Sequence, residues 1–290
     1  MLNALSVDVE DYYQVSAFES VVRIDSWGQH ESRVERNTHR VLDLLDEGNV
    51  KATFFILGWV AERSHNLVRI ISSRGHEIAS HGYAHQLIYT QTREQFRDET
   101  RRAKRIVEDI ISQRIIGYRA ASYSITAESL WALDILAEEG FEYDSSIFPI
   151  RHDRYGIPNH QRFFHILNGN GRLPIAEVPL STLRIGGFNI PVAGGGYFRM
   201  LPYAVTHRAM LYLNRVEKQP AVFYFHPWEI DPNQPRIQAR LFSRFRHYTN
   251  LRGMEGKLRK LLANFSFAPI RDVHAAALSL SSSRVENNAA

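Results

Sequence analysis

Short apolar runs alternate with amphipathic stretches through the first two-thirds of the chain. The runs are rich in Val, Ile, Phe and Tyr, which is typical of buried β-strands. Strands are therefore predicted over residues 3–9, 51–56, 76–80, 117–119 and 221–225.

The stretches between these runs carry apolar residues at helical spacing. Between residues 30 and 47, for example, Val34, Val41 and Leu45 fall on one face, and Gly48 follows as a stop signal. Helices are predicted over residues 30–47, 61–74, 93–112, 127–139 and 202–217.

Strands that alternate with helices favour a parallel α/β arrangement. From residue 149 to residue 203 the pattern changes, because Gly and Pro become frequent (GNGRLP, GGFNIPVAGGGYF). This composition predicts loops and short antiparallel strands inserted into the main unit. The glycines at 194–196 indicate either a close backbone approach to a ligand or a mobile loop. We expect one domain over 1–275, with an insertion at about 150–203, a basic helical extension at about 232–265 and a flexible tail over 276–290.

Composition limits the available chemistry. The 290 residues are 44% hydrophobic and 23% charged, which is ordinary for a globular protein with a sizeable core. The chain has no cysteine, so disulfides, thiolate metal sites and cysteine nucleophiles are excluded. A bound metal would need His, Asp, Glu or backbone oxygen as its ligands.

The formal charge is +4, and basic residues are densest between Arg236 and Lys260. A solvated helical face is the favoured interpretation of that stretch. The alternative is attraction to an anionic glycan or peripheral contact with a membrane. No nucleic-acid-binding motif accompanies the charge, so no nucleic-acid partner is expected.

The N-terminus reads MLNALSVDVEDYY, without a basic region or a long apolar segment, so no signal peptide is predicted. No run of about 18 apolar residues occurs, so no transmembrane helix is predicted either. The expected location is the cytoplasm.

Ionisable residues follow four of the predicted strands. In parallel α/β folds the carboxyl ends of the strands meet at one edge, where functional groups gather. The residues are Asp8, Glu10 and Asp11 after the first strand, His81 and His85 after the third, Arg119 after the fourth, and His226 after the last.

His81 and His85 are four residues apart, which would place both imidazoles on one face of a helical turn and let them share a cation. Clustered carboxylates repel one another unless positive charge lies among them, although a helix N-terminus would also stabilise them. Two histidines and one carboxylate with open positions suit zinc or another divalent transition metal. Such an ion could polarise a carbonyl and lower the pKa of a bound water, whose proton a neighbouring carboxylate would take.

Three further residues have two interpretations each. His226 is either a core residue or the proton donor that a departing amine needs in amide hydrolysis. Arg119 could orient a carboxylate or form a wall of the pocket. Asp144 is either a partner of His226 or Arg119, or a turn residue.

Taken in order, five segments resemble the motif series of the polysaccharide deacetylases, the NodB-homology carbohydrate esterases. They are SVDVED, HGYAH, GYRAASYS, YDSSIFP and FYFHPWE, and the resemblance runs from about Ser6 to Glu229. The segments DVEDYYQV, YDSSIFP and FHPWEID are similar to sequences of one branch of this family, which is associated with exopolysaccharide biosynthesis and exosortase-type systems.

The resemblance implies a deformed (β/α) barrel of about seven parallel strands. It also implies metal-dependent removal of acetyl groups, with zinc as the favoured ion, from N-acetylhexosamine units of a polysaccharide or a lipid-linked oligosaccharide. By motif position, Asp8 resembles the family's catalytic base, His81 and His85 its metal ligands, Arg119 and Asp144 the arginine and aspartate of the third and fourth motifs, and His226 the catalytic acid. The oxyanion would be stabilised by the metal and a backbone N–H near Tyr123.

The chain departs from the family pattern in the first motif. Val9 follows Asp8, where two adjacent aspartates are common, so Glu10 is the expected carboxylate ligand and Asp11 the alternative. Ala121 also stands where the third motif usually has a proline.

Two other functions compete with deacetylation. An allantoinase-like hydrolysis of a cyclic amide is one, although retention of both His81 and His85 favours the metal-dependent deacetylases. A catalytically inactive glycan-binding module is the other. Sugar stacking in either case would suit the aromatic residues Tyr12, Tyr13, Tyr197, Phe198 and Trp228.

Overall fold

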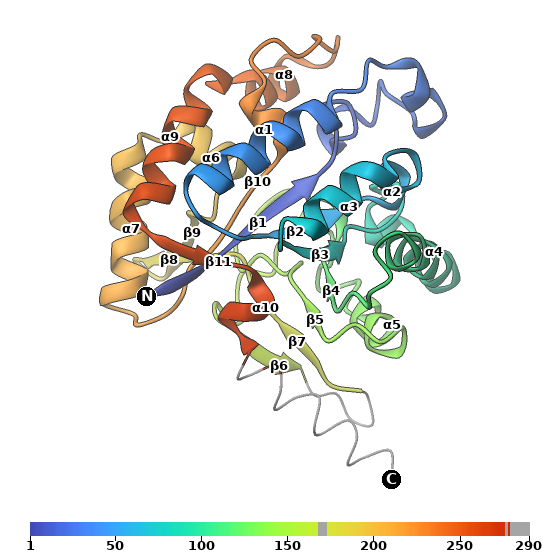
Figure 1. The fold of residues 1–290 in the computed structure, drawn as a ribbon. Helices are drawn as coiled ribbons and strands as arrows, with labels where there is room; N and C mark the ends of the chain where they lie inside the picture. Colours follow the sequence, from blue (N-terminus) through green and yellow to red (C-terminus); the bar gives the residue numbers. More distant parts are fainter. Residues whose placement is uncertain (168–172, 276–277, 279–290) are drawn as a thin grey trace.

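The computed structural model describes residues 1–167, 173–275 and 278. Within this part, helices surround one curled sheet (Figure 1). The strands are β1 Leu2–Val9, β2 Thr53–Ile56, β3 Glu77–Ser80, β4 Gly117–Tyr118, β5 Tyr143–Asp144, β6 His165–Leu167, β7 Ile175–Glu177, β8 Thr182–Ile185, β9 Phe188–Pro191, β10 Val222–Phe225 and β11 Ser266–Ala268.

The helices lie mainly on the outside of the sheet (Figure 1). The α-helices are α1 Val34–Glu47, α2 Gly58–Arg63, α3 His65–Ser73, α4 Arg93–Ile111, α5 Trp131–Glu138, α6 Gly195–Met200, α7 Tyr203–Arg215, α8 Leu241–Tyr248, α9 Leu251–Asn264 and α10 Ile270–Val273. Short 3₁₀ helices are η1 Ser16–Phe18, η2 Ile24–Gln29, η3 Ile88–Thr90, η4 Ala121–Tyr123 and η5 Pro227–Ile230.

The sheet has the strand order β10-β1-β2-β3-β4-β5-β7-β6, and β11 also pairs with β1. From β10 to β7 the neighbouring strands are parallel, whereas β6 runs antiparallel to β7. The sheet therefore has the predicted architecture, a deformed barrel of parallel strands with short antiparallel additions.

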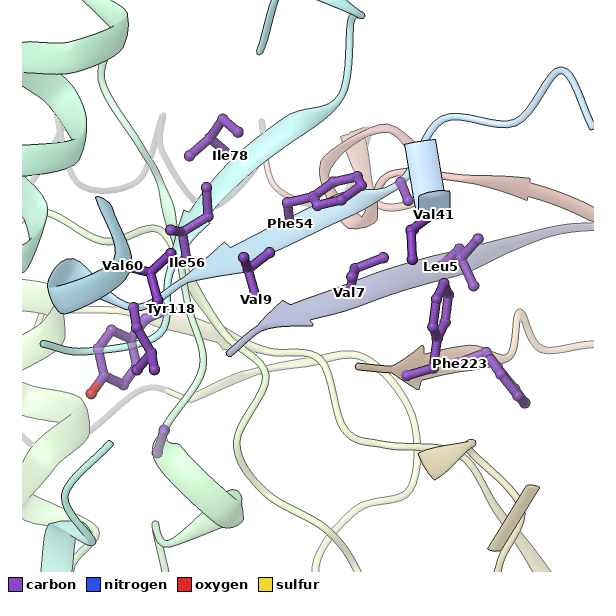
Figure 2. Packing of buried hydrophobic residues seen from close by; sticks show 14 of the residues in the cluster. Leu5, Val7, Val9, Val41, Phe54, Ile56, Val60, Ile78, Tyr118 and Phe223 are labelled. Atoms are coloured by element: carbon purple, nitrogen blue, oxygen red, sulfur yellow. The ribbon is translucent and has the colours of Figure 1, made fainter. Parts of the chain in front are cut away.

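Residues alternate along β1 between the helical layer and the inside of the barrel, as the period of a strand requires. Leu5, Val7 and Val9 pack in the main core, and Figure 2 shows them beside Phe54 of β2 and Val41 of α1. The residues between them point the other way, so Ser6 and Asp8 lie in the interior of the barrel. This alternation places the Asp8 carboxylate inside.

Three predicted helices have different bounds in the structure, and one of them, expected over 127–139, begins only at Trp131. The helix expected over 30–47 begins only at Val34. The helix expected over 61–74 is two helices, because Ser64 leaves the helical region with φ −128° and ψ 52°.

The stretch predicted as an insertion contains part of the main sheet. It supplies the antiparallel hairpin β8–β9 as expected, but β7 is a parallel strand of the barrel. β7 is only three residues long, too short for a hydrophobic pattern to identify.

At Gly194, the first of the three glycines, the structure fits neither of the two predicted environments. Gly194, with φ +127°, forms a bridge to Tyr224 of β10, and a Cβ at this position would lie 1.9 Å from the Tyr224 carbonyl oxygen. The close approach is thus to the chain's own backbone, and the run continues into α6 rather than a loop. With the Ser181 hydroxyl, which accepts from the Val222 N–H at 2.7 Å, this bridge joins the segment after β7 to β10.

The C-terminal part adds helices and a strand. α8 and α9 form the predicted basic helical extension, whereas β11, which pairs with β1, was not predicted. The predicted tail at 276–290 lies outside the described residues except for Leu278. Among the described helices, none is long and apolar enough to cross a membrane.

Candidate active site

A cavity of about 540 Å³ opens over the carboxyl ends of the strands. Asp8, Glu10 and His226 line it from the strand ends, together with the loop histidines His81 and His85. Its outer wall comes from the segments around η1, residues 152–155, α6 and α8. The structure therefore brings together five of the predicted site residues.

Glu10, His81 and His85 form a cluster that could hold a metal ion. Each offers one ligand atom, and these atoms all lie within 4.8 Å of one another. The Nδ1–H of His81 donates to the carbonyl of Arg119 at 2.8 Å, which leaves Nε2 free of a proton and available as a ligand. Burial lowers the pKa of His81 to about 4, so its imidazole is neutral, the form that binds metals.

The histidine pair does not lie on a helical turn as predicted. Residues 81–85 form a loop after β3, in which Gly82 has φ +73° and His85 has φ +52°. The left-handed residues bend the chain back, so the two rings still meet, with centroids 5.4 Å apart. The shared site is thus made by a loop instead of by helical periodicity.

The polar atoms of the cluster fit a cation. The Oε2 atom of Glu10 lies 2.8 Å from Nε2 of His85, yet this buried oxygen makes no hydrogen bond within the described structure. Burial favours the neutral form of Glu10, but attraction to His85 and His226 outweighs it and holds the pKa of Glu10 below its ordinary value. A buried, ionised carboxylate facing two imidazoles is a typical donor set for zinc.

Asp11 is not a member of this cluster. Its Oδ2 accepts from the backbone N–H groups of Arg33 at 2.6 Å and Val34 at 3.0 Å, and from the Ser32 hydroxyl at 3.0 Å. It therefore caps the start of α1, which explains why that helix begins at Val34. Of the two carboxylates left open by the sequence, the structure puts Glu10 at the candidate metal site and Asp11 at a helix terminus.

Asp8 is held by a buried arginine. Arg119 Nη1 donates to Asp8 Oδ1 at 2.7 Å and to the Ser6 hydroxyl at 2.7 Å. Nε and Nη2 of Arg119 donate to the carbonyl and hydroxyl of Ser145. Arg119 has no exposed surface, so it orients the Asp8 carboxylate and does not form a wall of the pocket.

His226 is oriented by a carboxylate that the sequence interpretation missed. Its Nδ1–H donates to Glu229 Oε2 at 3.2 Å, while Nε2 faces Glu10 Oε1 at 3.5 Å and Asp8 Oδ2 at 3.9 Å. Burial alone lowers the pKa of His226, but the combined attraction of Glu10, Glu229 and Asp8 raises it to about 9.

Glu229 is itself fixed by Arg199. The Arg199 Nε donates to Glu229 Oε1 at 2.6 Å, and its other nitrogens donate to backbone carbonyls of residues 246, 247 and 249. Glu229 stands three residues after His226 in FHPWE, the spacing of a capping box, and that signal could have identified it. The partnership with Arg199 has no comparable local signal.

Of the two interpretations of Asp144, the structure fits the turn residue and not a partner of His226 or Arg119. Asp144 accepts from the backbone N–H and hydroxyl of Ser146, and it shares a hydrogen bond with Glu177. Burial raises the pKa of Glu177 well above its ordinary value, and the neighbouring Asp144 charge raises it further, so the pair holds a proton. Asp144 lies behind the cavity and does not line it.

The backbone N–H of Tyr123 is already engaged, because it donates to the Ala120 carbonyl at 3.1 Å. This particular N–H is therefore not free to act as the oxyanion donor that the resemblance places near Tyr123. The Tyr123 hydroxyl instead lies 3.4 Å from Asp8 Oδ2, and Trp228 Nε1 donates to Glu10 Oε1 at 3.2 Å. Both aromatic residues line the cavity beside the two carboxylates.

Two protein families match successive parts of the chain. Residues 25–142 match the family described as polysaccharide deacetylase, and residues 145–275 match a domain of unknown function (DUF3473). The boundary falls at β5, so both parts supply strands to the same barrel.

Curated relatives match over shorter stretches. A peptidoglycan-N-acetylglucosamine deacetylase of Bacillus cereus is 36% identical over 81 residues, 28% of this chain and 28% of that protein. A chitooligosaccharide deacetylase of Bradyrhizobium sp. is 31% identical over 100 residues, 34% of this chain and 43% of that protein. The aligned part thus spans less than half the length of either relative.

Solved structures share the fold over nearly the whole chain. A Mycobacterium smegmatis protein that has been assigned to the polysaccharide deacetylases superposes with a TM-score of 0.60 at 18% identity, covering 97% of this chain and 90% of that one. Puue allantoinase gives a TM-score of 0.57 at 15% identity, covering 94% and 89%. At such identities the similarity is one of fold.

Proposed function

The chain carries a domain of the polysaccharide deacetylase family, and from this premise we propose that it is a metal-dependent N-deacetylase of acetylated amino sugars. One observation carries the proposal. The ligand atoms of Glu10, His81 and His85 converge beside two further groups, Asp8 and His226, at the floor of one cavity. Metal-dependent hydrolysis of an amide uses a base, an acid and an electrophilic ion in such an arrangement.

A divalent ion at this cluster, for which zinc is our choice, would polarise the acetyl carbonyl and acidify the attacking water. Asp8 takes the water's proton, because Arg119 holds its Oδ1 and leaves Oδ2 directed at the cavity. His226 donates its Nε2 proton to the sugar nitrogen as the carbon–nitrogen bond breaks. The products are acetate and the free amine.

Glu229 and Arg119 act as positioning residues in this scheme. Glu229 fixes the His226 tautomer through Nδ1 and favours its protonated form, which a general acid requires. Arg119 fixes Asp8 in one orientation.

The walls of the cavity suit a carbohydrate. The half-buried Tyr197 lines it, and an aromatic ring can stack on the apolar face of a sugar. We propose N-acetylhexosamine units of a bacterial polysaccharide or a lipid-linked oligosaccharide as the substrate class. Both curated relatives are named for deacetylation of such glycans.

The test is the release of acetate by the purified chain from N-acetylglucosamine oligomers and from acetylated peptidoglycan fragments. We expect acetate and free amine in equal amounts. Parallel assays with a cyclic amide such as allantoin distinguish the allantoinase-like reaction, since the fold is common to both. Ring opening without acetate release would contradict the proposal, as would tight glycan binding with no hydrolysis of any acetylated sugar.

A further inference from the structure

α8 presents an apolar face to solvent at the rim of the cavity. Leu241 is 81% exposed, Phe242 65% and Phe245 62%, and at positions i, i+1 and i+4 they share one side of the helix. Figure 1 shows α8 at the top of the molecule. Burial in the core does not explain these residues, because all three lie among the most exposed large side chains of the described structure.

The sequence around this face is basic. Residues 232–254 contain no Asp or Glu, so their arginines face no acidic neighbour in sequence; these are Arg236, Arg240, Arg244, Arg246 and Arg252. Arg240 and Arg246 line the cavity, and within the described part of the chain neither pairs with a carboxylate; the Arg246 guanidinium lies 4.5 Å from the Phe242 ring centroid. The nearby carboxylates of Glu19 and Asp153 already face Arg154 and His152.

The helix is firmly attached on its other side. His247 is buried, stacks on Trp228 with ring centroids 4.1 Å apart, and bonds Gln234 at 2.7 Å. Arg199 donates to the carbonyls of residues 246 and 247. The exposed side chains are therefore displayed by a fixed helix and not by a fraying segment.

We propose that α8 and its arginines form a surface that binds the interface of an anionic lipid bilayer. Leu241, Phe242 and Phe245 enter the interfacial region, where Phe and Leu partition favourably, and the arginines pair with lipid phosphates. Because Phe242 and Arg246 also line the cavity, the bound orientation places the cavity mouth beside the membrane surface.

The positive charge of this surface favours a bilayer over a second copy of the chain as its partner. A two-fold contact through this face would bring each copy's arginines against the same arginines of the other, with no carboxylate among residues 232–254 to neutralise them. An anionic bilayer supplies both the apolar medium and the negative charge that the face lacks.

The test is co-sedimentation of the full chain with vesicles of phosphatidylglycerol and phosphatidylcholine, or of phosphatidylcholine alone. We expect binding to the anionic vesicles that weakens as salt is raised. The double variant Leu241→Ser/Phe245→Ser should bind about tenfold or more weakly. Neither residue lines the cavity, so its acetate release from a soluble oligosaccharide should stay at the wild-type level.

The matched control is Ile185→Ser/Phe188→Ser, which removes two apolar side chains that are 60% and 75% exposed on the β8–β9 hairpin. It should bind vesicles like the wild type. Equal loss in both double variants, or no binding to anionic vesicles at all, overturns the proposal. So does a wild-type dimer in solution that the α8 variant makes monomeric. None of these outcomes depends on whether the chain deacetylates sugars.

Discussion

Arg119 shows what single side chains contribute to this site. Its guanidinium lies 4.1 Å above the Phe55 ring and donates to Ser6, Asp8 and Ser145, without any contact with solvent. A residue so enclosed acts on the reaction only through Asp8. The same holds for Glu229, which acts through His226.

Substitution of Glu10 should weaken metal binding, whereas substitution of the adjacent Asp11 should lower stability. Glu10→Gln removes the anionic member of the metal cluster, so affinity for Zn²⁺ should fall on the order of 100-fold or more. Asp11→Ala leaves the cluster intact but removes the cap of α1, which should lower the free energy of unfolding by about 1–2 kcal/mol. Calorimetric zinc titration and urea unfolding in chelator measure the two quantities. Loss of zinc affinity in Asp11→Ala with none in Glu10→Gln would reverse the assignment.

Glu229→Gln tests how His226 is tuned. Glu229 raises the pKa of His226, so the variant's imidazole should lose its proton at lower pH. A general acid works below its pKa, so the alkaline limb of kcat/KM should move down by about one pH unit or more. Glu217→Gln, which removes the carboxylate that pairs with Arg162, is the control and should leave the limb in place. If the alkaline limb of Glu229→Gln lies at the same pH as in the wild type, the pairing with Glu229 does not control the pKa of the general acid His226.

Among the helices and strands, the sequence predicted the long ones well. β1, α1, α4 and β10 follow strong hydrophobic patterns, and the structure contains all four. β5, β7 and β11 are two or three residues long, so their strand character comes from pairing with distant neighbours and leaves no local pattern. His81 and His85 have the spacing of a helical turn although they lie in a loop, and only the backbone dihedral angles distinguish the loop from a helix.

Among the described glycines, Gly194 has the least space for a side chain. Its φ of +127° and the 1.9 Å approach of a Cβ to the Tyr224 oxygen leave no room for alanine. Gly194→Ala should lower the free energy of unfolding by about 3 kcal/mol or more and displace β10. Gly186→Ala is the matched control: Gly186 has φ +56° but open space around it, so only the cost of the left-handed backbone remains, about 1–2 kcal/mol. Equal losses in urea unfolding would contradict the role of the bridge.

At the scale of the whole molecule, the meeting of five ionisable residues at one cavity follows from the rule that parallel strands end at the same edge of a sheet. The sequence alone predicts this convergence for Asp8, Glu10, His81, His85 and His226. The partners of these residues were less predictable, because such contacts depend on the closed barrel and no local spacing encodes them. Arg199 reaches Glu229 from thirty positions away, and Asp144 meets Glu177 across two strands.

The Asp144–Glu177 pair should make the stability of the barrel depend on pH. The raised pKa of Glu177 means that the folded chain keeps a proton that the unfolded chain releases above about pH 4.5. The pair's contribution is therefore present at low pH and is lost as pH rises. Glu177→Gln retains a donor towards Asp144 without titrating, so its stability relative to the wild type should increase between about pH 5 and pH 8. If the difference in free energy of unfolding between Glu177→Gln and the wild type, measured in urea, is the same at both pH values, Asp144 and Glu177 do not share a proton.

In the proposed mechanism, hydrolysis depends on an ion that Glu10, His81 and His85 hold. The most direct measurement is acetate release from an N-acetylglucosamine oligomer by chelator-treated protein, titrated with zinc while bound metal is quantified. We expect no activity in the metal-free protein and activity that rises in proportion to bound metal, to a plateau at one ion per chain. Full activity in the metal-free protein, or no activity once one ion is bound, would contradict this mechanism.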